Sequence, residues 1–192
     1  EKNQAALIEA LALLRKQDGT EGGGAQGLNV GLAIVGSGVL EATLRARIDS
    51  LGLSGHVALL GQMDNPFPVL GGADLFVLPS LHEGQPVTLL EAMTLGTGVV
   101  ASDLPGNREL IDLGYGVLSG TSPQDIAQAI RSALADPRLA HGAFDVTEHN
   151  ARSLRDTLEA VLGPEALHQQ PQGKTASKRR RRKRAASRGK PA

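Results

Sequence analysis

The chain has 192 residues, of which 41% are hydrophobic and 2% aromatic, so its core must be built from aliphatic side chains. It contains no cysteine, which excludes disulfides and thiolate metal sites and fits a reducing compartment. Ten of the 20 Lys and Arg residues lie in Lys174–Lys190, whereas all 20 Asp and Glu residues lie at or before Glu165. The body is therefore acidic, which argues against a nucleic-acid surface, and a basic tail follows it.

Apolar spacing predicts strands and helices in alternation. Helices are expected over 1–16, 39–53, 86–95, 122–136 and 147–162, with a turn or short helix over 66–73. Strands are expected over 28–36, 56–61, 74–80, 98–102 and 116–119, and the first reads as buried on both faces. Ser122 is a predicted N-cap, with Pro123 at the first helical position. This order predicts an α/β fold in which a parallel sheet is flanked by helices.

The sequence also predicts where the folded domain ends and where the natural chain begins. Residues 1–165 are predicted to form the folded domain, and residues 166–192, which have no apolar periodicity, a disordered tail rich in Lys and Arg. The chain begins at Glu1 without a methionine, which predicts that its natural N-terminus lies upstream.

Four polar turns follow predicted strands and should meet at one edge of the sheet, where ligands of parallel sheets bind. They are residues 36–38, 61–65, 79–86 and 102–107. The first, with Gly36 and Gly38, has the form of a phosphate-binding turn, but the third glycine of a dinucleotide fingerprint is replaced by Glu41. A plain strand-to-helix turn explains it equally well.

The stretch HEGQPVTLLEAM, residues 82–93, carries the strongest signal. Pro86 suits the first turn of a helix, so the N–H groups of the next three residues should be free to face the loop and hold a diphosphate. Glu83 precedes this helix and Glu91 lies within it, which fits an anion with a polyol on either side, such as a nucleotide sugar. A capping or solvent role for each glutamate is the alternative, and a glycosidase-like acid/base pair is a third reading.

The segment from Phe76 to Leu110 resembles the donor-binding, C-terminal domain of retaining GT-B glycosyltransferases of the family-4 type. The shared pattern is a Pro-Ser turn, a Glu, a short loop containing glycine, and a second Glu eight residues on. The resemblance covers roughly residues 1–136. It implies a Rossmann-like domain that is one half of a GT-B fold, and transfer of a sugar from a nucleoside diphosphate to an acceptor, with cell-envelope polysaccharide or glycolipid synthesis as the candidate process.

The resemblance also implies roles for individual residues. Glu91 would bind the donor ribose, Glu83 a hydroxyl of the transferred sugar, and Lys2 the leaving diphosphate. Further donor contacts are implied for Gly84, Gln85, Val87, Met63, Gly36 and Gly38, with Met63 holding the base through its backbone. Because Lys2 and helix N–H groups can neutralise the departing diphosphate, no metal or other cofactor is expected.

This sequence departs from the family at the loop Gly84-Gln85-Pro86, which in the family is often Gly-Phe-Gly. The arginine that accompanies Lys2 in the family, and the N-terminal acceptor domain, do not occur in the chain, so transfer by this chain alone is not expected. The domain is expected in the cytoplasm. The tail would attract it to the anionic inner face of a membrane, and solvated tail residues are the alternative. The rival functions are a non-catalytic module for sugar nucleotides or polyanions, and a nucleic-acid binder that acts through the tail.

Overall fold

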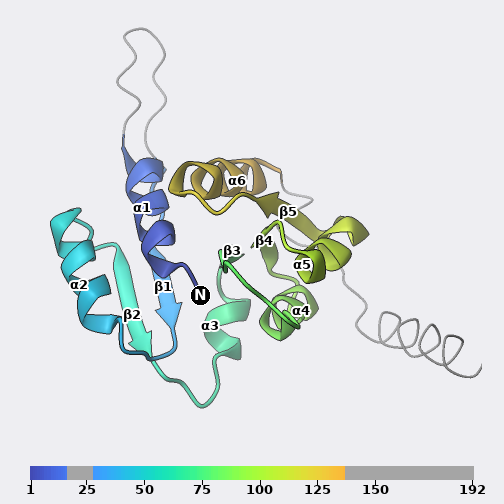
Figure 1. Cartoon of the computed structure of the whole chain (residues 1–192), viewed down its shortest axis with the longest axis horizontal. Helices are drawn as coiled ribbons and strands as arrows, with labels where there is room; N and C mark the ends of the chain where they lie inside the picture. The colour runs from blue at the N-terminus through green and yellow to red at the C-terminus, as the bar shows by residue number, and fades with distance from the viewer. Residues whose placement is uncertain (17–27, 137–192) are drawn as a thin grey trace, which may run out of the picture. The chain divides into compact units, whose positions relative to one another are not determined.

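The computed structural model describes residues 1–16 and 28–136, which form strands and helices in alternation (Figure 1). In chain order the elements are α1 (Gln4–Arg15), β1 (Leu32–Val35), α2 (Glu41–Ser50), β2 (Val57–Gly61), α3 (Phe67–Gly71), β3 (Leu75–Leu78), α4 (Val87–Thr94), β4 (Gly98–Ser102), α5 (Pro105–Leu110), the π-helical turn η1 (Ile111–Tyr115), β5 (Gly116–Ser119) and α6 (Pro123–Ala135). The predicted helix over 147–162 and the predicted tail lie outside the described residues. Within the described ranges, no helix has the length and apolar character needed to cross a membrane.

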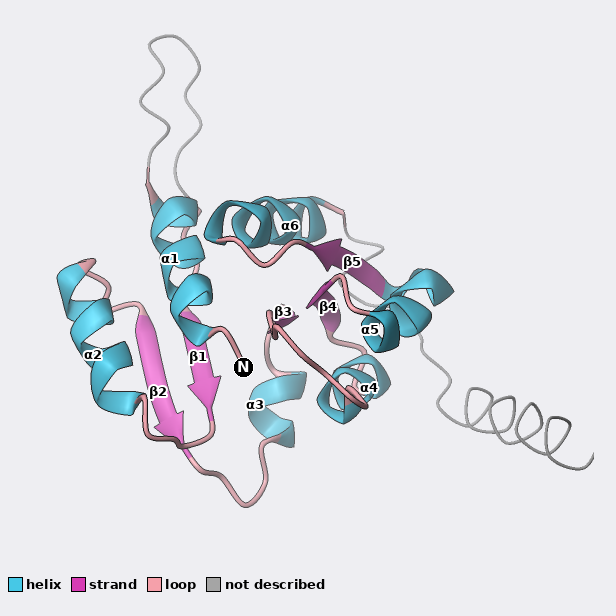
Figure 2. Ribbon diagram, viewed as in Figure 1, coloured by secondary structure: helices cyan, strands magenta, loops and turns pink. Residues whose placement is uncertain are grey.

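All strand pairs are parallel, as predicted, and they form two sheets (Figure 2). β1 pairs with β2, with Leu32 opposite Val57. β4 lies between β3 and β5, with Val100 opposite Val77 and Val117. Among the described strands, no ladder joins one sheet to the other. The α/β class with parallel strands and flanking helices is confirmed.

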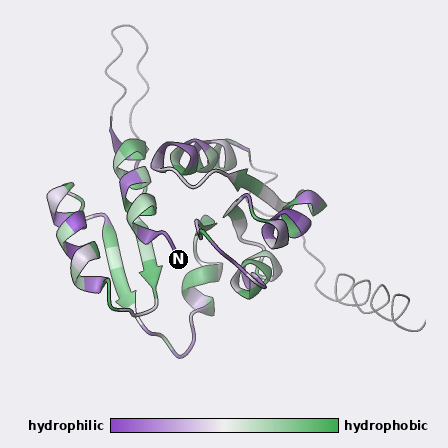
Figure 3. Ribbon diagram, in the orientation of Figure 1, coloured by the Kyte–Doolittle hydropathy of each residue, from purple (hydrophilic) through white to green (hydrophobic). Residues whose placement is uncertain are grey.

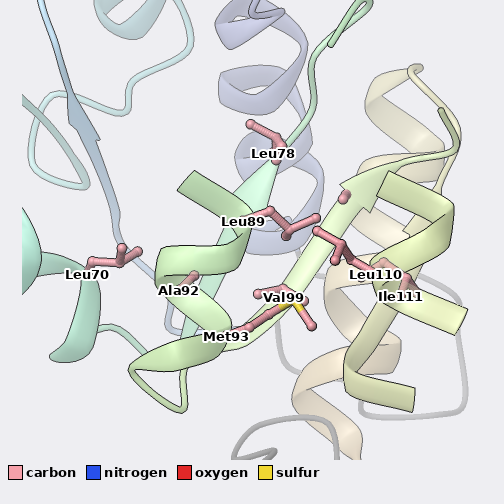
Figure 4. Packing of buried hydrophobic residues seen from close by; sticks show 9 residues of the cluster. Leu70, Leu78, Leu89, Ala92, Met93, Val99, Leu110 and Ile111 are labelled. Carbon is pink, nitrogen blue, oxygen red and sulfur yellow. The ribbon is translucent and has the colours of Figure 1, made fainter. Parts of the chain in front are cut away.

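Strand β4 is the centre of the second sheet and is buried along its whole length. Val99 lies in one apolar cluster with Leu89 and Met93 of α4, which Figure 4 shows packed around it. Val100 lies in a second cluster, formed with α1 and α6. Successive side chains of a strand point to opposite faces, so this apolar run requires helices on both sides of the sheet.

In the described part of the chain, helices cover one face of the first sheet only. Leu32 and Ile34 of β1 pack with α1 and α2. Ala33 and Val35 alternate with them and are exposed, Val35 to 40%. Both strands are apolar along most of their length (Figure 3). The expectation of burial on both faces is therefore wrong for β1, because apolar content identifies a strand but not the number of helices that cover it.

The helix starts differ in how visible they are in the sequence. The Ser122 cap is confirmed: its hydroxyl accepts a hydrogen bond of 3.1 Å from the N–H of Asp125, and α6 begins at Pro123. Helix α5 occupies part of a region expected to be a loop. It has six residues and contains Gly106 in its first turn, so it shows too little apolar periodicity to be recognised.

Candidate functional site

The N-terminal residues lie against the loops that follow β3 and β5. The N–H of Leu81 donates to the carbonyl of Glu1 at 2.8 Å. On the other side, the Asn3 side-chain amide donates to the carbonyl of Thr121 at 3.0 Å. Asn3 has a φ of 55°, in the left-handed region that Asn tolerates better than most residues. The backbone on either side of Lys2 is therefore held in place before α1 begins.

This arrangement brings Lys2 to Glu83, two candidate residues that lie 81 positions apart in the sequence. Lys2 Nζ donates to Glu83 Oε1 at 2.7 Å, with the glutamate side chain 9% exposed and the lysine side chain 58% exposed. Burial raises the pKa of Glu83. Hydrogen bonding from Lys2 and Ser80, together with the charge of Lys2, outweighs burial and holds that pKa below its usual value. Glu83 is therefore ionised at neutral pH.

Ser80 is a member of this group that the sequence analysis did not single out. It is fully buried, and its hydroxyl contributes to the lowered pKa of Glu83. Ser80 Oγ nevertheless has no partner among the described residues that meets the distance and angle of a hydrogen bond. The hydroxyl of Ser80 is therefore a polar group that favours the charge of Glu83 without a hydrogen bond of standard geometry. The Pro-Ser turn of the family pattern is the signal in the sequence that points to it.

The start of α4 offers fewer free N–H groups than predicted. Pro86 is the N-cap residue, and the N–H of Val87 donates to the carbonyl of Gln85 at 2.9 Å. The N–H of Leu89 donates to the carbonyl of Pro86 at 3.0 Å. Of the three N–H groups expected to face the loop, only that of Thr88 makes no hydrogen bond in the described part of the chain. Gln85 and Val87 are both exposed.

Glu91 lies in the second turn of α4 and is half-buried, next to the fully buried Ala92. Its carboxylate has no hydrogen-bond partner or ion pair among the described residues, so its acceptor sites remain available. The structure does not bring Glu91 into contact with Glu83. The predicted pair therefore consists of one carboxylate that is already paired with a cation and one that is not.

The remaining candidates follow the strands of the first sheet. Gly36 follows β1 and has a φ of 113°, which a residue with a side chain rarely adopts, and its N–H donates to the carbonyl of Gly61 at 2.7 Å. Gly38 is exposed, and Met63, after β2, is half-buried. No hydrogen bond of the described residues joins these three to Lys2 or Glu83.

Gly106, in α5, packs closely against the loop that carries Glu83. A Cβ at this position would lie 3.3 Å from the carbonyl oxygen of Gly84 and 3.5 Å from Cδ of Pro86. The next residue, Asn107, is fully buried, and its side-chain amide donates to the carbonyl of Ser102 at 2.8 Å. This bond anchors α5 to the end of β4, so the lack of a side chain at residue 106 sets how closely the loop approaches. The sequence shows the glycine at residue 106 but not that the loop of Gly84 and Pro86 packs against it.

Arg108 of α5 forms an exposed ion pair with Asp103. Among the described residues there is no cluster of three or more His, Cys, Asp or Glu side chains that would hold a metal ion. The polar groups that converge at the carboxyl end of the second sheet are thus one cation, one ionised carboxylate and one buried hydroxyl, beside the start of a helix.

Known proteins share both the sequence pattern and the fold. Residues 1–145 match the family described as glycosyl transferases group 1. The chain is 35% identical over 153 residues to the amylovoran biosynthesis glycosyltransferase AmsK of Erwinia amylovora, which covers 76% of this chain and 34% of AmsK.

Two further comparisons concern ligands and acceptors named for those proteins. The chain is 39% identical over 88 residues to the N,N'-diacetylbacillosaminyl-diphospho-undecaprenol alpha-1,3-N-acetylgalactosaminyltransferase of Campylobacter jejuni, covering 45% of this chain and 23% of that enzyme. The crystal structure of Anabaena HepE in complex with UDP-glucose superposes with a TM-score of 0.62 at 27% identity, covering 83% of this chain and 46% of HepE. The chain therefore spans less than half the length of each of these relatives.

Proposed function

Because the chain belongs to the glycosyl transferases group 1 family, we propose that it is the donor-binding domain of a retaining glycosyltransferase of the family-4 type. The substrate bound here is a nucleoside diphosphate sugar. The observation that carries the proposal is the Lys2–Glu83 ion pair, which sets a cation and an ionised carboxylate side by side next to the start of α4. A diphosphate needs the cation, and a sugar hydroxyl needs the carboxylate.

Departure of the diphosphate leaving group explains why the site needs both a cation and the start of a helix. When the glycosidic bond to the diphosphate breaks, negative charge grows on the phosphate oxygens. Lys2 and the free N–H of Thr88, with the positive end of the α4 dipole behind it, are the groups that stabilise this charge. Because these groups stabilise the leaving group, the proposed reaction requires no metal ion.

The two glutamates bind the two sugar rings of the donor. Glu83 accepts a hydrogen bond from a hydroxyl of the transferred sugar, and Glu91, whose acceptors are free, accepts from the ribose. Around them, further contacts come from the exposed loop and the turns of the first sheet: Gly84, Gln85, Val87, Met63, Gly36 and Gly38. The N–H of Val87 must leave the carbonyl of Gln85 before it can bind a ligand.

The acceptor is proposed to be a cell-envelope polysaccharide or glycolipid precursor. AmsK is named for amylovoran biosynthesis, and the Campylobacter enzyme for an undecaprenol diphosphate. We propose that the acceptor wall of the cleft comes from an N-terminal domain outside this chain, so the chain binds donor but does not transfer sugar alone. This fits the share of AmsK and HepE that the chain spans, 34% and 46%.

The Lys- and Arg-rich residues Lys174–Lys190 give a further element of the proposal, attraction to the anionic inner face of a membrane from the cytoplasm. Each basic residue near an anionic surface contributes on the order of 1 kcal/mol. Pelleting of the full chain, and of a chain ending at 165, with vesicles that contain phosphatidylglycerol tests this. Equal pelleting of the two proteins at low and high salt would refute it.

A non-catalytic module that binds sugar nucleotides or other polyanions is the alternative, because the chain spans less than half the length of the enzymes that it resembles. The two are separated by joining the chain to the sequence encoded upstream. An upstream domain that confers sugar transfer supports the enzyme, and a start codon immediately before Glu1 supports the module.

Donor binding is tested by thermal shift and titration calorimetry with UDP-, GDP- and ADP-glucose, since a ligand that binds the folded chain raises its melting temperature. UDP-glucose is the first candidate, because HepE was crystallised with it. Replacing Glu91 with Gln is expected to weaken binding of the preferred nucleotide by about tenfold, the equivalent of roughly 1.4 kcal/mol for a charge-assisted hydrogen bond. Glu9→Gln, on α1, is the matched control, and equal binding by both variants and the parent would refute the site.

A further inference from the structure

The two groups proposed to hold the opposite sides of the donor bond are bound to each other in the structure. Lys2 Nζ, proposed for the diphosphate, donates to Glu83 Oε1, proposed for the sugar, at 2.7 Å. Lys2 has two further N–H donors, but a diphosphate that attracts its ammonium group competes with Glu83 for it. What a ligand offers to each partner then decides how well it binds.

The pair is positioned by the backbone and is not a chance meeting of two mobile side chains. The carbonyl of Glu1 is fixed to the N–H of Leu81, and Asn3 is fixed to the carbonyl of Thr121. Lys2 lies between these two anchored residues, and Glu83 is two residues beyond Leu81. The pair therefore re-forms whenever neither partner is bound to a ligand.

Lys2 and Glu83 differ in how far water can stabilise each charge once the ion pair is broken. The Lys2 side chain is 58% exposed, so water can solvate its ammonium group when Glu83 is lost. The Glu83 side chain is 9% exposed, and among the described residues the other group that favours its charge is the hydroxyl of Ser80, which makes no hydrogen bond of standard geometry. Taking Lys2 away therefore leaves a nearly buried carboxylate without compensation, which is unfavourable.

From this asymmetry we propose that the Lys2–Glu83 ion pair makes the site select diphosphates that carry a sugar over nucleoside diphosphates that do not. A nucleotide sugar draws Lys2 to its phosphates and gives Glu83 a hydroxyl donor in return. A nucleoside diphosphate without a sugar draws Lys2 away and brings negative charge towards Glu83. It supplies no sugar hydroxyl that could donate a hydrogen bond to Glu83. After transfer, loss of the sugar leaves Glu83 without a hydrogen-bond donor, and re-formation of the ion pair with Lys2 favours release of the nucleoside diphosphate. This inference rests on the proposed function.

The test compares UDP with UDP-glucose, and likewise the GDP and ADP pairs, by titration calorimetry on the full 192-residue chain. In the parent, the sugar nucleotide is expected to bind more tightly than the nucleoside diphosphate. In Glu83→Gln, UDP should bind about fivefold more tightly than it does to the parent, because Lys2 is released and the repulsion is removed. UDP-glucose should bind more weakly, so the preference for the sugar is lost.

A second variant keeps the test independent of how well Glu83→Gln folds. Lys2→Met should weaken UDP binding, and adding Glu83→Gln to it should recover part of the loss, since the uncompensated carboxylate is then gone. Glu9→Gln should leave both affinities unchanged. If Glu83→Gln weakens UDP and UDP-glucose by the same factor, the inference is wrong while the donor site stands. If the parent binds no member of the three pairs, the proposed function and this inference both fail.

Discussion

Replacing Gly106 with Ala perturbs the Glu83 loop through one defined contact. The new methyl group would lie 3.3 Å from the carbonyl oxygen of Gly84 and 3.5 Å from Pro86 Cδ, so the loop must move by a few tenths of an ångström. The Gly84 loop is exposed and can yield, whereas α5 is anchored through the buried Asn107. The displacement should therefore pass to the loop that carries Glu83 and not to the core.

The magnitudes predict a change in binding without a comparable change in stability. Overpacking costs about 1–3 kcal/mol, and an exposed loop places this site at the lower end of that range. Alanine also stabilises a helix by about 1 kcal/mol relative to glycine, which offsets much of the cost. Misalignment of Glu83 and the start of α4 should weaken a charge-assisted hydrogen bond by about 1.5 kcal/mol, which is roughly tenfold in the dissociation constant for UDP-glucose.

The assay is urea unfolding for stability and titration calorimetry for binding, with Gly55→Ala as the matched control. A Cβ at residue 55 would meet nothing within 4 Å, so neither quantity should change. Gly116→Ala sets the other limit, because its Cβ would clash with Val99 Cγ2, and this substitution should unfold the second sheet. If Gly106→Ala binds UDP-glucose like the parent while remaining folded, the argument that this glycine sets the loop position is refuted.

Three further predictions concern stability. The pKa of Glu83 is lowered by folding, so the stability that its ion pair supplies is fully present above the unfolded value of 4.5 and is lost as pH falls through the folded value. The difference in urea midpoint between the parent and Glu83→Gln should therefore shrink on acidification, and a constant difference would contradict it. Ser122→Ala removes the cap on Asp125 and should lower the free energy of unfolding by about 1 kcal/mol, with Ser54→Ala as an exposed control. Leu89→Ala opens a cavity in the core of the second sheet and should cost about 2–5 kcal/mol in the same assay, so a loss under 1 kcal/mol would show that the site collapses freely.

Local patterns in the sequence were sufficient to predict most of the fold. The apolar run of β4 predicted a strand, and Ser122 with Pro123 predicted the start of α6, because each signal is complete within a few residues. The equally apolar run of β1 predicted a strand but not its exposed face. That face depends on which helices lie nearby, and no local pattern records this.

The candidate site was predictable to a similar extent. The glutamates and the start of α4 follow from one short stretch, and the resemblance to a family supplied Lys2. The contact between Lys2 and Glu83 spans 81 positions, and that between Asn3 and Thr121 spans 118, so both depend on the tertiary fold. The occupied N–H of Val87 was missed for another reason: Pro86 has a ψ of 65°, which folds the chain back onto the carbonyl of Gln85.

The separation of the strands into two ladders has a mechanical consequence. Backbone hydrogen bonds resist shear, and none of the described ones crosses between β1 and β3. The two halves are joined through α1, whose Leu7 and Leu14 interlock with α6 while Ile8 and Leu11 interlock with α2. Helix α1 therefore packs against one helix on each of its two sides. We therefore expect that the turns after β1 and β2 can shift relative to those after β3 and β4 by repacking of side chains, with every ladder left intact.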